Sequence, residues 1–231
     1  MIARALLGCY AALGLLNVAA LATGTDALAS ATKPLLMPVL LAWLLVAVRA
    51  RGNGQPALRW LAIGLVFAWL GDVLLMGSGD AFFISGIGAF LLMQVCYLLA
   101  FTRIEGPGLV RAWKIALVPY VVMWLVLNVL ISDGVGDLRI PVVVYSAVLV
   151  AMAVAALDLV IRVPRKAGWR IAGGALLFVL SDALIATTAF GPLDASNATA
   201  TVIMATYIAS QAMIVTGMVD ALRPSGTPAT R

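Results

Sequence analysis

The stretch "RWLAIGLVFAWLGDVLLM" at residues 59–76 decides the fold class, because it is long and apolar and carries one acidic side chain, Asp72. A helix that crosses a bilayer needs about 20 predominantly apolar residues. The rest of the chain has a similar composition, with 64% of its 231 residues hydrophobic and only 11% charged. A mean hydropathy of +1.10 is too high for a soluble domain of this size. We therefore expect an all-α integral membrane protein.

Apolar windows of spanning length recur along the chain, and the segments between them are short. The eight expected transmembrane helices lie at about 5–22, 31–48, 58–76, 83–102, 113–131, 141–161, 170–188 and 200–220. The connections leave no room for a soluble domain. Residues 1–231 are therefore expected to form a single polytopic membrane domain that ends in a short tail at 223–231.

The positive charges predict how these spans are oriented. Only two of the fifteen Lys and Arg residues, Lys33 and Arg139, fall on one side of the eight-span arrangement. The other side holds Arg4, Arg49, Arg51, Arg59, Arg103, Arg111, Lys114, Arg162, Arg165, Lys166, Arg170, Arg223 and Arg231. Because basic loops stay in the cytoplasm, both termini are expected there, in a bacterial inner (plasma) membrane. The net charge of +5 thus reflects topology and does not indicate a nucleic-acid partner.

Asp72 has a counterpart 110 positions later, in "WRIAGGALLFVLSDALIA" at residues 169–186. When the two segments are aligned with this offset, and the helices that follow them with a slightly longer one, similar residues fall at equivalent positions. The pairs are Gly64 with Gly174, Asp72 with Asp182, Phe90 with Tyr207, and Gln94 with Gln211. They predict two four-helix repeats, within 1–110 and 111–222. Each half has an even number of spans, so the halves are expected in parallel orientation, about an axis along the membrane normal.

The two aspartates are expected at the same depth in the membrane. Asp72 follows Arg59 by 13 residues and Asp182 follows Arg170 by 12, which places both roughly 18–20 Å from the cytoplasmic face. A charged carboxylate at the bilayer centre costs about 2.5–3.5 kcal/mol on insertion scales, and such residues usually face the bundle interior and serve a function. Polar anchoring between helices is the alternative, and the matched depth favours a functional pair.

Further polar residues are expected to converge near that depth. Lys33, at the outer end of the second span, can meet an anionic head group, pair with an aspartate or simply reach the interface. Gln94 and Gln211 lie within spans that run back inward, with Tyr207 one turn above Gln211 and Tyr145 near the outer end of the sixth span. Glutamines can also bridge membrane helices structurally, so both roles stay open for them.

The residue types that are missing narrow the chemistry. The chain has no histidine, which excludes His-based catalytic triads and His-ligated zinc. Its two cysteines, Cys9 and Cys96, both fall within expected spans and are interpreted as small core residues. No phosphate-binding glycine loop is present either. We expect neither a metal nor a cofactor, which leaves acid–base chemistry by carboxylates, or ion coupling.

Six stretches of the sequence resemble the YhhN family of transmembrane lysoplasmalogenases, over almost the full length of the chain. They are "TKPLLMP" (32–38), "LGDVLLM" (70–76), "FFISGIGAFLLMQVCYLLAF" (82–101), "VYSAVLVAM" (144–152), "LLFVLSDALIA" (176–186) and "TYIASQAMI" (206–214). The resemblance implies hydrolysis of the vinyl ether bond of a lysophospholipid in the membrane, which releases a fatty aldehyde and a glycerophospho-alcohol. Carried over by motif, the candidate site residues are Lys33, Asp72, Tyr97, Asp182, Tyr207 and Gln211. The sequence departs from the family at Gln94, where members often carry a histidine.

The expected mechanism gives the two aspartates different roles. One of Asp72 and Asp182 protonates the vinyl carbon and the other stabilises the cation and orients water, as the two carboxylates of glycosidases do. The sequence does not say which is which. Lys33 would hold the phosphate, and Gln94, Gln211 and Tyr207 would order the water. Two alternatives remain: a small proton-coupled transporter, to which membrane carboxylates and parallel repeats are also suited, and a non-catalytic lipid-binding membrane protein.

Overall fold

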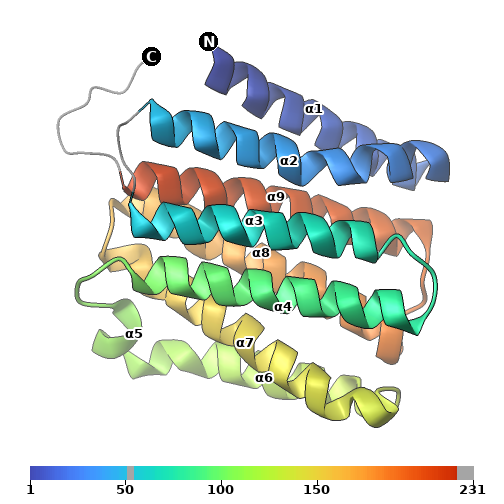
Figure 1. Ribbon diagram of the computed structural model, residues 1–231. Helices are drawn as coiled ribbons and strands as arrows, with labels where there is room; N and C mark the ends of the chain where they lie inside the picture. Colours follow the sequence, from blue (N-terminus) through green and yellow to red (C-terminus); the bar gives the residue numbers. More distant parts are fainter. Residues whose placement is uncertain (51–54, 223–231) are drawn as a thin grey trace.

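The protein is an all-helical bundle (Figure 1). The computed structural model describes residues 1–50 and 55–222, with only the backbone of Arg111, and this part of the chain contains no strand. Seven of its helices are long and apolar enough to cross a membrane. They are α1 (Ile2–Ala22), α2 (Asp26–Arg49), α3 (Pro56–Leu74), α4 (Asp80–Thr102), α7 (Arg139–Asp158), α8 (Arg165–Phe190) and α9 (Asn197–Ala221). The short 3-10 helices η2 (Gly136–Leu138) and η3 (Leu159–Ile161) flank α7.

The segment predicted as the fifth span, 113–131, is less regular than expected. It follows the four-residue α5 (Leu109–Ala112) and contains the four-residue 3-10 helix η1 (Lys114–Leu117) and the thirteen-residue α6 (Val118–Leu130). Trp113 has φ −134° and ψ 81°, which is not a helical conformation, and Pro119 has no N–H to donate to the preceding turn. These two residues shorten the apolar helix. The structure therefore gives seven helices of spanning length and one shorter apolar helix in the described residues, and eight spans stay a prediction.

The ends of the helices have signals in the sequence that explain them. α3 begins at Pro56, whose fixed φ suits the first turn of a helix. At the start of α9, Ser196 accepts a hydrogen bond from the backbone N–H of Thr199 at 3.1 Å. Asp26 and Asp80 stand in the first turns of α2 and α4, where a negative charge favours the exposed N–H groups.

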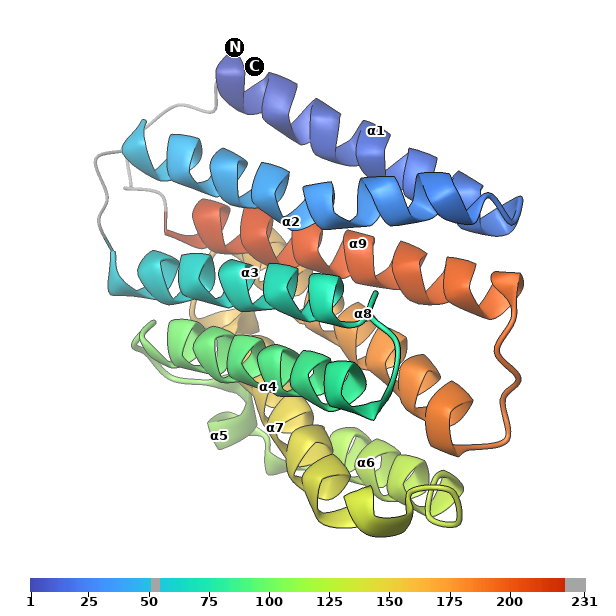
Figure 2. The same ribbon diagram turned by 45° about the vertical axis from the view of Figure 1, so that its right-hand side comes forward.

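When the shorter α6 between α4 and α7 is included, successive helices run in alternate directions, so that α1 begins and α9 ends at the same end of the bundle (Figures 1 and 2). We call this end the terminal end and the other the distal end. The terminal end carries, on helix ends and connections, Arg4, Arg49, Arg59, Arg103, Lys114, Arg162, Arg165, Lys166 and Arg170. Lys33 and Arg139 lie toward the distal end. Arg51, Arg223 and Arg231, with the predicted tail, fall outside the described residues. The two ends thus separate the charges as predicted, and the side of the membrane that each faces stays a prediction.

Two helix pairs pack especially closely, α3 with α4 and α8 with α9. Glycines make this possible: a Cβ atom on Gly64 would lie 2.5 Å from the ring of Tyr97, and one on Gly174 would lie 2.9 Å from Met213 Cβ. Small residues allow membrane helices to approach in this way. The two glycines hold equivalent positions in the predicted repeat. The repeat itself, with halves 1–110 and 111–222, stays a prediction.

Prolines in α2 leave backbone carbonyl groups that need other partners. Pro38 cannot donate a hydrogen bond to the carbonyl of Pro34, and the indole N–H of Trp69 on α3 donates to that oxygen instead, at 3.1 Å. A side chain of the neighbouring helix therefore replaces a missing bond of the helix, as the apolar surroundings of a membrane helix require. This contact joins α2 to α3 near Lys33.

Candidate functional site

Asp72 lies in the last turns of α3, where only 2% of its surface is exposed. The hydroxyl group of Tyr207 on α9 donates a hydrogen bond to its Oδ2 atom at 2.8 Å. The amino nitrogen of Lys33 on α2 lies 3.8 Å from its Oδ1 atom. A buried charge is tolerated when it has a charged partner and hydrogen bonds. Asp72 thus has the surroundings of an ionised carboxylate.

Asp182 on α8 has different surroundings, although 8% exposure makes it nearly as buried. Its Oδ2 atom accepts hydrogen bonds from the Tyr145 hydroxyl of α7 at 2.5 Å and from Gln94 Nε2 of α4 at 3.3 Å. Among the side chains that the structure describes, no Lys or Arg nitrogen lies within ion-pairing distance of it. The two aspartates are therefore alike in burial and differ in charge environment.

A third polar contact lies deeper in the bundle. The Tyr97 hydroxyl donates a hydrogen bond to Gln211 Oε1 at 2.6 Å, and both side chains are fully buried. Gln211 Nε2 and Gln94 Oε1 are also buried, and neither has a hydrogen-bond partner within the described chain. A buried polar atom without a partner costs about 1–3 kcal/mol. One donor and one acceptor are thus left for a polar molecule from outside the chain.

These contacts arrange the eight predicted site residues in three separate groups. Lys33, Asp72 and Tyr207 form one group, which we call the lysine centre; Tyr145, Gln94 and Asp182 form a second, the acid centre; Tyr97 and Gln211 form the third contact. In each group, a residue from the first predicted repeat half, 1–110, contacts a residue from the second, 111–222. The Phe90 ring links the two centres, because it packs edge-on against Tyr207, with centroids 5.9 Å apart, and lines a cavity beside Asp182.

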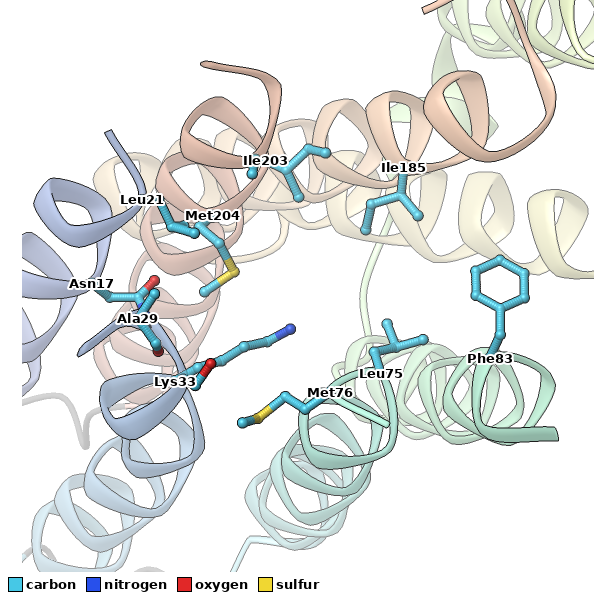
Figure 3. A pocket seen from close by; sticks show the side chains of 12 residues that line it. Asn17, Leu21, Ala29, Lys33, Leu75, Met76, Phe83, Ile185, Ile203 and Met204 are labelled. Carbon is cyan, nitrogen blue, oxygen red and sulfur yellow. Dashed lines mark hydrogen bonds between the residues drawn. The ribbon is translucent and has the colours of Figure 1, made fainter. Parts of the chain in front are cut away.

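Two neighbouring cavities adjoin these centres toward the distal end. The larger, of about 400 Å³, lies between α1, α2, the turn after α3, the start of α4, α8 and α9, and its walls include Asn17 and Lys33. Figure 3 shows the Lys33 amino group directed into it. The smaller, of about 50 Å³, is lined by Tyr145, Asp182 and Phe90 among others. Leu75, Phe83 and Ile185 line both cavities, so these apolar side chains form the partition between them.

One polar contact in the wall of the larger cavity was not predicted from the sequence. Asn17 on α1 is buried, and its Nδ2 atom donates to the Ala29 carbonyl and to the Thr32 hydroxyl of α2. The only signal in the sequence was a single asparagine within an otherwise apolar span.

In the part of the chain that the structure describes, no group of three His, Cys, Asp or Glu side chains could together hold a metal ion.

Comparisons with known proteins place the chain in a family. The model of the YhhN family matches residues 28–218. The lysoplasmalogenase TMEM86A of Bos taurus is 31% identical over 199 residues, which cover 81% of this chain and 78% of that protein. A lysoplasmalogenase of Mycobacterium tuberculosis (strain CDC 1551 / Oshkosh) is 30% identical over 190 residues, 79% of this chain and 70% of that protein. No solved structure gives a significant match. The extent of these matches shows that the chain belongs to the YhhN family.

Proposed function

We propose that this protein is a membrane-embedded hydrolase that cleaves the vinyl ether bond of a lysoplasmalogen-type lysolipid. The products are a fatty aldehyde and a glycerophospho-alcohol. The names of its relatives support the substrate class. The observation that carries the proposal is the acid centre. Its buried carboxyl group has no cation beside it among the described side chains, and it lines a cavity that adjoins a larger one lined by a lysine.

The reaction explains why such a carboxyl group is useful. A proton adds to the vinyl carbon remote from the ether oxygen, which leaves an oxocarbenium ion. Water adds to that ion and loses a proton, and the resulting hemiacetal collapses to an aldehyde and an alcohol. The net reaction consumes one water molecule and needs no oxidant or reductant. The protein must supply a proton, an anion near the cation, and an ordered water.

The two centres suit different parts of this task. Asp182 lines the smaller cavity and has no cation partner among the described side chains, so burial favours its neutral acid form, which can give its proton to the vinyl carbon. Asp72 stays ionised beside Lys33 and, with Tyr207, holds the amino group at the larger cavity, where it can bind the phosphate. We assign to the Asp72 carboxylate, as the second member of the predicted pair, the role of the anion that stabilises the oxocarbenium ion.

The unpartnered atoms of the two glutamines support a place for the water. Water both donates and accepts hydrogen bonds, which matches the acceptor Gln94 Oε1 and the donor Gln211 Nε2. Gln94 also binds Asp182, so a water on Gln94 stands near the acid centre. We assign the ordering of the hydrolytic water to these residues, with Tyr97 fixing the orientation of Gln211.

The same proposal includes the topology: eight spans in one polytopic domain, formed by two parallel four-helix repeats, with both termini in the cytoplasm of a bacterial cell. The basic terminal end and the common position of the first and last helix ends support it. The shorter apolar segment Lys114–Leu130 would be the remaining span, at about 25 Å in length when helical throughout.

Proton-coupled transport is the second candidate function. Pro34 and Pro38 interrupt the hydrogen bonds of α2 beside the Lys33–Asp72 pair, and interrupted helices at buried charges are typical of transporters. Proton flux into proteoliposomes would measure this activity directly.

The decisive experiment is aldehyde release by the purified protein in detergent, with a panel of vinyl ether lysolipids, followed by mass spectrometry. In D₂O, protonation at carbon should place one deuterium on the carbon next to the aldehyde group. The same aldehyde incubated alone in D₂O controls for exchange. If no vinyl ether lysolipid yields aldehyde, the hydrolase proposal fails and transport becomes the leading candidate.

A further inference from the structure

Asn17 is held in one orientation by two hydrogen bonds to α2. Only 1% of its surface is exposed, and its Nδ2 atom lies 2.8 Å from the Ala29 carbonyl oxygen and 2.9 Å from Thr32 Oγ1. A carbonyl oxygen can only accept a hydrogen bond, so the amide atom that faces it must be the nitrogen. The Oδ1 atom therefore points away from these partners, and its identity is fixed by chemistry.

This Oδ1 atom is a buried acceptor without a donor among the described residues. Buried polar groups in native proteins nearly always have a hydrogen-bond partner, so a donor from outside the chain is expected here. Asn17 lines the larger cavity together with Lys33, and Figure 3 shows its side chain directed from α1 toward that cavity. Its partner Thr32 immediately precedes Lys33. The residues that line this cavity thus include one cation and one asparagine whose Oδ1 atom has no partner in the described chain.

A glycerophospholipid with one chain has matching groups on neighbouring carbons. Its phosphate is an anion, and the free hydroxyl of the adjacent glycerol carbon is a donor. A lipid with a second chain at that carbon has an ester oxygen there, which can only accept, and Oδ1 would stay unpaired. We propose that Asn17 Oδ1 binds this free hydroxyl while Lys33 binds the phosphate, and that Asn17 thereby selects lysolipids over lipids with two chains.

This inference rests on the proposed function, because it assigns a substrate group to the same site. The test compares a vinyl ether lysolipid with an analogue in which hydrogen replaces the middle hydroxyl, with head group and chain unchanged. The wild-type protein should process the deoxy analogue with a kcat/KM at least about 10-fold lower, because a site built for a hydroxyl rejects a ligand that lacks it. Asn17→Ala should lose activity on the hydroxyl substrate and no longer distinguish the two.

Asn128→Ala is the matched control. Asn128 lies on α6 and its Nδ2 atom donates to the Trp124 carbonyl and to Ser146 Oγ, so this variant also removes an asparagine that links two helices. It does not line the larger cavity, and it should keep the wild-type ratio between the two substrates. If Asn17→Ala lowers both activities by the same factor, Asn17 is only structural. Equal rates for both substrates in the wild type would overturn the inference without any variant.

A binding measurement separates this inference from the proposed reaction. Alkyl ether lysolipids have no vinyl bond to cleave, so the affinity of the wild-type protein for the hydroxyl and deoxy forms can be measured without turnover, by quenching of tryptophan fluorescence. The hydroxyl form should bind at least about 5-fold more tightly. Equal affinities, or no binding of either form, would overturn the role of Asn17. Absence of aldehyde together with a preference for the hydroxyl form would refute only the hydrolase.

Discussion

Replacement of Lys33 by methionine should destabilise the protein through the charge it leaves behind. Methionine keeps most of the apolar length of the side chain and removes the amino group 3.8 Å from Asp72. At that distance, with an effective dielectric constant of about 20, the attraction between the two charges is roughly 4 kcal/mol. The Lys33 side chain is 21% exposed, so water weakens the attraction, and we expect a loss of about 2 kcal/mol.

The double variant Lys33→Met/Asp72→Asn tests the electrostatic origin of that loss. Asparagine at position 72 can still accept a hydrogen bond from Tyr207 and carries no charge, so the double variant should be more stable than Lys33→Met alone. The measurement is a thermodynamic cycle of unfolding in mixed micelles for the wild type, both single variants and the double variant. We expect a coupling between the two positions of at least about 1 kcal/mol.

Two outcomes would refute this reasoning. Additive effects of the two replacements would show that the Lys33 amino group and the Asp72 carboxylate do not stabilise each other. A Lys33→Met protein as stable as the wild type would show that Asp72 needs no cation, and would remove the structural distinction between the two aspartates. In kinetic assays of the proposed activity, Lys33→Met should mainly raise KM, as expected from the loss of a phosphate contact.

Three further predictions address the acid, the packing and the topology. Asp182→Asn should lower kcat for aldehyde release by at least about 100-fold in a protein whose thermal unfolding is close to that of the wild type; near-normal release would exclude Asp182 as the acid. Gly64→Ala should lower the unfolding temperature in detergent, because the added carbon would lie 2.5 Å from the Tyr97 ring, and an unchanged temperature would contradict the close contact. With both native cysteines replaced by alanine, an impermeant thiol reagent should label Ser78→Cys in intact cells and not Lys166→Cys; the reverse pattern would invert the predicted orientation.

Much of the bundle could be predicted because the sequence patterns that define membrane helices are local. Length and apolarity placed the long helices within a few residues, and alternating charge separated their ends. The fifth window shows the limit of that approach: hydropathy counts apolar residues, and it does not register that Trp113 and Pro119 interrupt the hydrogen bonds of a helix. The predicted span therefore became a 3-10 turn followed by a short helix.

The site was only partly predictable, for a related reason. The position of polar side chains inside apolar spans singled out Asp72 and Asp182 as candidates. The structure places four of the predicted companions beside them, whereas Tyr97 and Gln211 contact each other instead. Which companion meets which aspartate depends on how distant helices rotate against one another, and no local pattern contains that information. Asn17 was not predicted, because a single asparagine in a membrane helix gives no sign of a function by itself. Its importance depends on its hydrogen-bond partners and on the absence of a donor for its oxygen within the described chain, which only the structure shows.

The difference between Phe90 and Tyr207 helps to explain why Asp72 and Asp182, which are the same residue type, have different surroundings. In the predicted repeat these aromatic residues hold the same position, and their rings pack against each other, so the two halves differ there by one hydroxyl oxygen. The Tyr207 hydroxyl donates a hydrogen bond to Asp72, whereas Asp182 accepts its hydrogen bond from the hydroxyl of Tyr145 on α7. A duplicated protein with strictly identical halves would surround both aspartates alike and give them the same charge. In the predicted repeat, the difference at this one position therefore contributes to the different hydrogen-bond partners of the two aspartates.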